Sequence, residues 1–181
     1  MEIWYTYTGA INPELIAGAI NWLNDQVYNK QVGKLKFFLS SIGGDTDSAI
    51  RLYDYLKASP FEVEMFGFGQ IDSAANIIFL AGVRRFAVKG CRFLLHEGTF
   101  TIGNPVSALH VHEETLRLLN IIHSRHVEII AQEIGKKKKE IMAILRQGEI
   151  FDTEKAKKFG LVHEIIEKFP LREDQAKTSD S

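Results

Sequence analysis

Residues 61–82, FEVEMFGFGQIDSAANIIFLAG, join two different hydrophobic patterns through a short turn. Apolar side chains alternate with others from 61 to 68, which is typical of a β-strand. From 74 to 82 nearly every residue is apolar, with Asn76 as a polar exception, and this indicates a buried helix. The glycine-containing stretch 69–73 is then the turn between them. A strand that leads through a turn into a helix is the repeating unit of an α/β protein.

The same order of strand and helix continues on both sides of this stretch. Further strands are expected at 3–8, 34–40, 85–88, 92–95 and 161–166, and further helices at 12–24, 45–58, 107–134, 140–145 and 153–158. The sequence therefore predicts an α/β fold with a largely parallel sheet flanked by helices. We expect one domain over residues 1–171 and a polar, disordered tail over 172–181.

Composition excludes several classes of function. The 181 residues are 45% hydrophobic, and 22 basic against 23 acidic side chains leave a net charge of −1, so neither nucleic acid nor an anionic membrane is an expected partner. The single cysteine, Cys91, cannot form an internal disulfide, and with six scattered histidines it offers no metal-finger spacing. No metal or cofactor is expected. The N-terminus is not a signal peptide and no apolar stretch reaches the length of a membrane span, so we expect a cytoplasmic protein.

Polar or glycine-rich residues follow three of the expected strands directly. These segments are Ser41–Asp45, Gly69–Ser73 and His96–Gly98. Ligands of α/β proteins bind at the carboxyl ends of the strands, where such segments meet. The sequence therefore predicts a site formed by these three loops.

Ser73 has two interpretations. It can cap the helix that follows, or it can act as a nucleophile at the end of the sheet, although its neighbours Asp72 and Ala74 differ from the glycines of the hydrolase nucleophile elbow. A nucleophilic serine needs a base, and His96 is the histidine that follows a strand end. Gly43–Gly44 is either a simple turn or a place where backbone N–H groups approach a substrate.

At these residues the sequence resembles the proteolytic subunit of the Clp protease, within the Clp/crotonase superfamily. Ser41–Gly44 (SIGG) corresponds to the family's Ser-Pro-Gly-Gly, and Gly69–Ala74 (GQIDSA) to its Gly-Gln-Ala-Ala-Ser-Met. Leu95–Glu97 (LHE) corresponds to the segment that carries the family's catalytic histidine. The likeness covers roughly residues 3–167, and the long helix from Ser107 resembles the family's handle.

The resemblance implies a serine endopeptidase that acts on peptides or unfolded polypeptide. Ser73 would be the nucleophile, His96 the general base and then acid, and the N–H groups of Gly44 and Ala74 the oxyanion hole. The substrate would lie extended between 44–47 and 97–100, in contact with Gly43, Gly44, Asp45, Glu97 and Gly98. The resemblance further implies a homo-oligomeric ring, with rings stacked through the handle.

The sequence departs from the family at the third catalytic position. Counting back from the Ile150–Ala156 segment places Gly148 where the family has its aspartate, and Glu149 next to it is the substitute that we consider. The family's N-terminal axial segment has no counterpart before Met1, so the resemblance does not carry over an AAA+ unfoldase partner. Two other hypotheses stay open: a catalytically inactive Clp-fold assembly subunit, and a crotonase-type acyl-CoA hydratase or isomerase.

Overall fold

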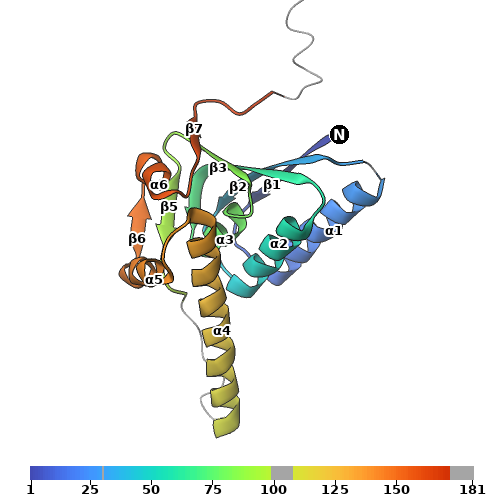
Figure 1. Cartoon of the computed structure of the whole chain (residues 1–181). Coiled ribbons are helices and arrows are strands. Elements are labelled where there is room, and N and C mark those ends of the chain that lie inside the picture. The colour runs from blue at the N-terminus through green and yellow to red at the C-terminus, as the bar shows by residue number, and fades with distance from the viewer. Residues whose placement is uncertain (30, 99–107, 172–181) are drawn as a thin grey trace, which may run out of the picture.

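The computed structural model describes residues 1–29, 31–98 and 108–171 (Figure 1). The expected tail at 172–181, the loop after Gly98 and the expected helix start at Ser107 lie outside the described residues. The elements are β1 (Glu2–Thr8), α1 (Pro13–Asn29), β2 (Lys34–Ser41), α2 (Thr46–Ala58), β3 (Glu62–Asp72), α3 (Ala75–Phe79), β4 (Arg84–Val88), β5 (Arg92–Leu95), α4 (Leu109–Ile134), α5 (Lys138–Gln147), β6 (Glu149–Phe151), α6 (Thr153–Phe159) and β7 (Glu164–Ile166).

Most of the strands form one parallel sheet in the order β1–β2–β3–β4–β7. Strand β3 is long enough to have two partners on one side. Its residues 64–67 pair with β4, and residues 70–72 pair with β5. The antiparallel strand β6 then pairs with β5. The predicted α/β class with a largely parallel, helix-flanked sheet is thus confirmed.

Several predicted boundaries are wrong, and the main one lies next to Ser73. Gly69–Asp72 is not a turn but the end of β3, because Gln70, Ile71 and Asp72 pair with residues 92–94 of β5. This pairing partner lies 22 residues away, so the local glycine signal could not reveal it. Strand β6 was not expected, α3 ends at Phe79, α1 continues to Asn29, α5 begins at Lys138 and β7 begins at Glu164.

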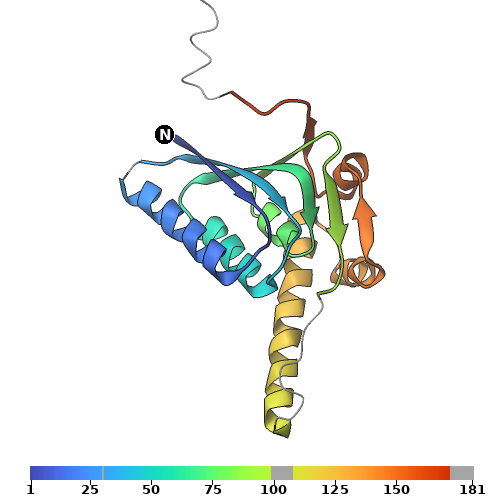
Figure 2. The ribbon, with the colours of Figure 1, turned by 180° about the vertical axis from the view of Figure 1, so that it is seen from behind.

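Helices α1 and α2 lie side by side against one face of the sheet, and α4 extends away from it (Figures 1 and 2). Neighbouring residues of a strand point to opposite faces, so Phe37 packs in the main core while Phe38 lies on the other face. There Phe38, Phe66 and Phe86 stack with ring centroids 4.8–4.9 Å apart. Phe169 contacts Phe38 edge-on at 5.0 Å. Both faces of the sheet therefore bury aromatic side chains.

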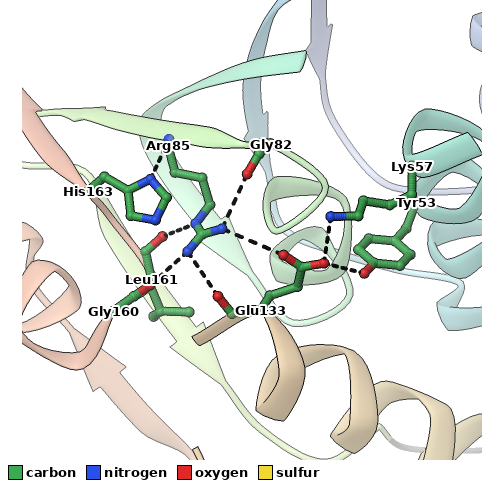
Figure 3. A network of polar contacts seen from close by, with 8 residues as sticks. All are labelled: Tyr53, Lys57, Gly82, Arg85, Glu133, Gly160, Leu161 and His163. Atoms are coloured by element: carbon green, nitrogen blue, oxygen red, sulfur yellow. Dashed lines mark hydrogen bonds and ion pairs between the residues drawn. The ribbon is translucent and has the colours of Figure 1, made fainter. Parts of the chain in front are cut away.

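A buried arginine ties the base of α4 to the sheet (Figure 3). Arg85, in β4, is 3% exposed. Its guanidinium donates to the carbonyls of Leu161, Gly82, Glu133 and Gly160 at 2.8–3.2 Å. Since one side chain saturates carbonyls from three separate segments, it fixes the end of α4 relative to β4 and to the turn after α6.

The Glu133 carboxylate balances the charge of this arginine. Its Oε2 lies 3.9 Å from the guanidinium of Arg85, while Oε1 accepts from the Tyr53 hydroxyl at 2.5 Å and pairs with the Lys57 ammonium at 2.9 Å. Burial, together with this carboxylate, raises the pKa of Tyr53, so its phenol stays a donor. The network thereby joins α2, α4 and β4.

Replacing Arg85 by methionine should destabilise the fold by about 3–5 kcal/mol, because four carbonyls lose their donors and the half-buried Glu133 carboxylate keeps only Lys57 as a cationic partner. The matched control is Arg84→Met in the neighbouring residue. The Arg84 side chain is 58% exposed and its ion pairs are 3.7 Å long, so a loss of about 1 kcal/mol or less is expected. Urea denaturation measures both. Equal losses in the two variants would contradict the role given to Arg85.

Candidate active site

The first and second predicted loops touch. A Cβ built on Gly43 would lie 2.5 Å from the carbonyl oxygen of Asp72 and 2.6 Å from the Cβ of Ser73. Only glycine fits this approach, and its φ of 85° is also in the left-handed region. The Ser41 hydroxyl accepts from the Gly43 N–H at 3.1 Å and donates to the Gly9 carbonyl at 2.6 Å, which holds the loop in place. Gly43 therefore serves to bring the loop against Ser73, and is more than a simple turn residue.

Ser73 stands in a strained backbone conformation. Its φ is 56°, and among the described residues it is the one non-glycine with a positive φ. The cap of α3 falls on Ala74 without a side-chain cap bond, so Ser73 does not cap this helix. The Ser73 N–H donates to the carbonyl of Leu94 at 2.8 Å. Strained non-glycine residues are common at functional sites, and this one is half-buried at the end of β3.

His96 lies at the same edge of the sheet. The register pairs Asp72 with Leu94, so the residues that follow, Ser73 and Leu95–His96, leave neighbouring parallel strands at the same end. His96 is half-buried. The carboxyl ends of β3 and β5 thus bring together the serine and the histidine that the sequence singled out.

Gly148, where the family's aspartate would stand, is next to His96. A Cβ built on Gly148 would lie 3.9 Å from the Cβ of His96, with no other contact within 4 Å. Gly148 is the C-cap of α5. The Glu97 N–H donates to the Leu145 carbonyl at 2.9 Å, which joins the end of α5 to the His96 segment.

The carboxylate of Glu149 is engaged elsewhere. In β6, Glu149 is opposite Leu95. Its carboxylate binds the ammonium of Lys155, which also lies over the ring of Phe151 at 4.9 Å from the centroid. The structure therefore places the side chain of Glu149 on a lysine of α6.

Two backbone N–H groups at this edge, those of Gly44 and Ala74, donate no backbone hydrogen bond in the described residues. Gly44 forms a bridge with Ile11, through the Ile11 N–H to the Gly43 carbonyl (2.8 Å) and the Asp45 N–H to the Ile11 carbonyl (3.0 Å). This pattern does not use the N–H of Gly44. Within the described part of the chain, neither that N–H nor the N–H of Ala74 donates a backbone hydrogen bond. Backbone N–H groups without a backbone acceptor can donate hydrogen bonds to a negatively charged oxygen.

The remaining predicted substrate contacts already have structural partners. The Asp45 carboxylate accepts from the Ser48 N–H at 2.8 Å and caps α2. The Glu97 carboxylate lies 3.8 Å from His123 Nε2 and 3.4 Å from the guanidinium of Arg146. Gly98 is half-buried, and residues 99–100 of the expected substrate groove lie outside the described residues.

The sequence pattern does not distinguish His126 from the other histidines of the long helix. His126 is 4% exposed, and its Nε2 has no hydrogen-bond partner in the described residues. Burial, and then the nearby charges of His123 and His96, lower its pKa to about 4. It is therefore a buried, neutral imidazole near His96.

The fold should lose stability in acid because of His126. In the unfolded chain the imidazole binds a proton near its ordinary pKa of 6.5. In the folded chain it stays neutral down to about pH 4. Stability then falls as the pH drops through this window, by about 2 kcal/mol between pH 7 and pH 5. His126→Met should remove this loss, whereas His110→Met, at an exposed position of the same helix, should keep it. Denaturant titrations at several pH values measure the difference, and parallel profiles for wild type and His126→Met would refute the expectation.

No group of three or more histidine, cysteine, aspartate or glutamate side chains in residues 1–29, 31–98 and 108–171 could hold a metal ion. In the same residues no helix is long and apolar enough to cross a membrane.

The fold and this loop cluster define an α/β protein with its candidate site at the carboxyl ends of a parallel sheet. A family model described as Clp protease matches residues 11–169. The chain belongs to the Clp protease family.

Individual relatives agree with this assignment. The ATP-dependent Clp protease proteolytic subunit 2 of Borreliella burgdorferi is 30% identical over 139 residues, which are 75% of this chain and 69% of that protein. The subunit of the same name from Frankia casuarinae is 27% identical over 135 residues, and the match covers 73% of this chain but only 60% of the Frankia protein. A solved structure of a ClpP1 mutant from Listeria monocytogenes has a TM-score of 0.81, with 23% identity and 91% of each chain covered. That likeness shows the fold.

Proposed function

We propose that this chain is a Clp-type serine endopeptidase subunit that cleaves peptides or unfolded polypeptide with Ser73 and His96. One observation carries the proposal. Ser73 directly follows β3 in a strained backbone conformation, Gly43 packs against it, and His96 directly follows the neighbouring strand β5. Glu149 is bound to Lys155, so we assign the chemistry to the Ser–His pair and leave the third position without a carboxylate.

The reaction runs through an acyl-enzyme. Ser73 Oγ attacks the peptide carbonyl carbon while His96 takes its proton, and the resulting oxyanion is held by the N–H groups of Gly44 and Ala74. The carbon–nitrogen bond then breaks, and His96 passes the proton to the leaving amine. Water, deprotonated by His96, hydrolyses the ester and frees Ser73.

The substrate lies extended in this proposal, between Gly44–Asp45 and Glu97–Gly98; the predicted contact with residues 46–47 is wrong, because these residues form the first turn of α2. Pairing of this kind uses main-chain groups, so it does not demand one sequence. The Glu97 N–H is already bonded to Leu145, which leaves the Glu97 carbonyl to pair with substrate. Gly43 and Gly44 allow the backbone on the other side to come close.

The proposal is tested with a fluorophosphonate probe, which forms a covalent bond with activated serines. We expect the purified wild-type chain to be labelled, and mass spectrometry of the digest to place the adduct on Ser73. Lack of labelling, with the chain folded and assembled, would instead support the inactive assembly subunit. Binding of acyl-CoA without labelling would support the crotonase-type enzyme.

We further propose that the subunit works as a cytoplasmic homo-oligomeric ring, with or without an AAA+ partner. The N-terminal half of α4 projects from the body (Figure 1). It also carries exposed apolar side chains. The exposed ones are Leu109, Val111, Leu116, Leu118 and Ile121, while Leu119 and Ile122 are half-buried. So many exposed apolar side chains on one projecting helix indicate a surface that is covered by a partner.

Light scattering at micromolar concentration should therefore show an oligomer. The double variant Leu118→Glu, Ile121→Glu should shift it towards smaller species, because it places charges on the 55% and 66% exposed apolar side chains. The control is Asn120→Glu, which adds a charge at an exposed polar position of the same turn. A stable wild-type monomer would contradict the assembly.

A further inference from the structure

A single buried amide, that of Asn76, lies under the Ser73 turn. Asn76 is fully buried in α3, a helix in which its neighbours are apolar. Its Nδ2 donates to the carbonyls of Ile71 at 3.0 Å, Ser73 at 3.0 Å and Leu94 at 2.9 Å. Its Oδ1 is buried and has no partner among the described residues.

These three carbonyls belong to the two segments that carry the proposed catalytic pair. Ile71 and Ser73 flank the last residue of β3, and Leu94 comes two residues before His96. The Leu94 carbonyl also accepts from the Ser73 N–H at 2.8 Å, and the Ser73 carbonyl from the Asn76 N–H at 3.1 Å. The Asn76 Nδ2 is thus hydrogen-bonded both to the strained Ser73 turn and to β5, the strand that leads to His96.

Granting the peptidase proposed above, we propose that Asn76 is a positioning residue that sets Ser73 and His96 in reacting geometry. The strained φ of Ser73 persists only if its surroundings hold it, and the bond from Asn76 to the Ser73 carbonyl acts directly on that peptide. The bond to Leu94 fixes the distance from this turn to β5. Asn76 touches neither substrate nor the reacting atoms, so it acts through the backbone.

The chemistry of the amide explains why asparagine stands here. An amide nitrogen provides two donor hydrogens, so three carbonyls can be served if two of them share one hydrogen, whereas a hydroxyl provides only one. The unpartnered Oδ1 carries a desolvation cost that an apolar residue would avoid. We infer that the hydrogen bonds of Nδ2 offset this cost, because they hold the Ser73 turn in place.

The test compares steady-state kinetics of Asn76→Ala with those of Leu56→Ala. Leu56 is buried in α2, and its truncation lowers stability without touching Ser73 or β5. We expect Asn76→Ala to lower kcat about 100-fold with KM within a factor of three, because small misplacement of reacting groups has effects of this size. Leu56→Ala should keep kcat near that of wild type.

The isosteric Asn76→Asp variant provides the pH signature that a merely structural role would lack. Its carboxylate repels the three carbonyls, but protonation restores one donor. The ratio of its kcat to that of wild type should therefore rise about 10-fold or more from pH 8 to pH 5. If the wild type turns over peptide and this ratio is flat, the inference is wrong. It is also wrong if Asn76→Ala has the same kcat as an active wild type. If wild type itself neither turns over nor reacts with fluorophosphonate, it is the peptidase assignment that fails.

Discussion

Ser73→Ala should reduce both fluorophosphonate labelling and peptide turnover to background. In an established serine protease, removal of the nucleophile lowers kcat by about 10⁶-fold, and the residual rate comes from substrate binding and the oxyanion hole. The fold should survive, because Ser73 does not cap α3 and its backbone N–H still reaches Leu94. Labelling intensity, turnover and the denaturation midpoint are measured on the same preparation.

The control for this variant is Ser59→Ala. Ser59, at the end of α2, donates from its hydroxyl to the Tyr55 carbonyl at 2.7 Å, so the same atom is deleted from a structural serine. Ser59→Ala should retain labelling and turnover. If Ser73→Ala keeps wild-type turnover, another residue is the nucleophile and the proposed mechanism is wrong.

Gly148→Asp should raise peptidase activity by about 100-fold, towards the 10⁴-fold that an orienting carboxylate contributes in a well-studied serine protease. The new side chain would start 3.9 Å from the Cβ of His96, with nothing else within 4 Å to obstruct it. Gly148 has a φ of 71°, a conformation that aspartate adopts more readily than most residues. The carboxylate would fix the tautomer of His96 and stabilise the imidazolium that forms during attack.

The decisive comparison is with Gly148→Asn. Asparagine has the same shape and tolerates the same backbone, and both variants lose the glycine's freedom there, but the amide carries no charge. We expect a large gain in kcat for aspartate and little or none for asparagine. Equal activities of the two variants would show that His96 does not lack a carboxylate at this position.

Much of the architecture follows from local pattern. Alternation over 61–68 and 34–40 predicts strands because side chains of a strand point to opposite faces, and the apolar spacing over 107–134 predicts a long helix. The polar and glycine-rich ends at 41–45, 69–73 and 96–98 predict where a site would form, since the carboxyl ends of parallel strands share one edge. These signals need only neighbours within a few residues.

Other features lie beyond such signals. The glycine at 69 favours a turn, yet pairing with β5 extends β3 to Asp72. The turn then falls on Ser73, whose positive φ is not expected for a serine. Glu149 looks suited to replace an absent aspartate, but an α6 lysine takes its carboxylate. In the first case a partner 22 residues away outweighs the local preference. In the second the folded chain brings the lysine of the following helix onto the carboxylate.

The sequence by itself determined the α/β class, the strand ends that gather at one edge, and the candidates Ser73 and His96, because short-range periodicity and backbone preference act within one segment. Only the tertiary structure decided what surrounds them. In the sequence, Asn76 is a polar exception in an apolar helix. In the fold, its amide donates to three carbonyls, from β3, the Ser73 turn and β5. The sequence likewise does not show that Arg85 is buried and donates hydrogen bonds to carbonyls up to 76 residues away. Hydrogen-bond satisfaction of buried polar groups is a property of the folded neighbourhood, and a linear pattern does not contain it.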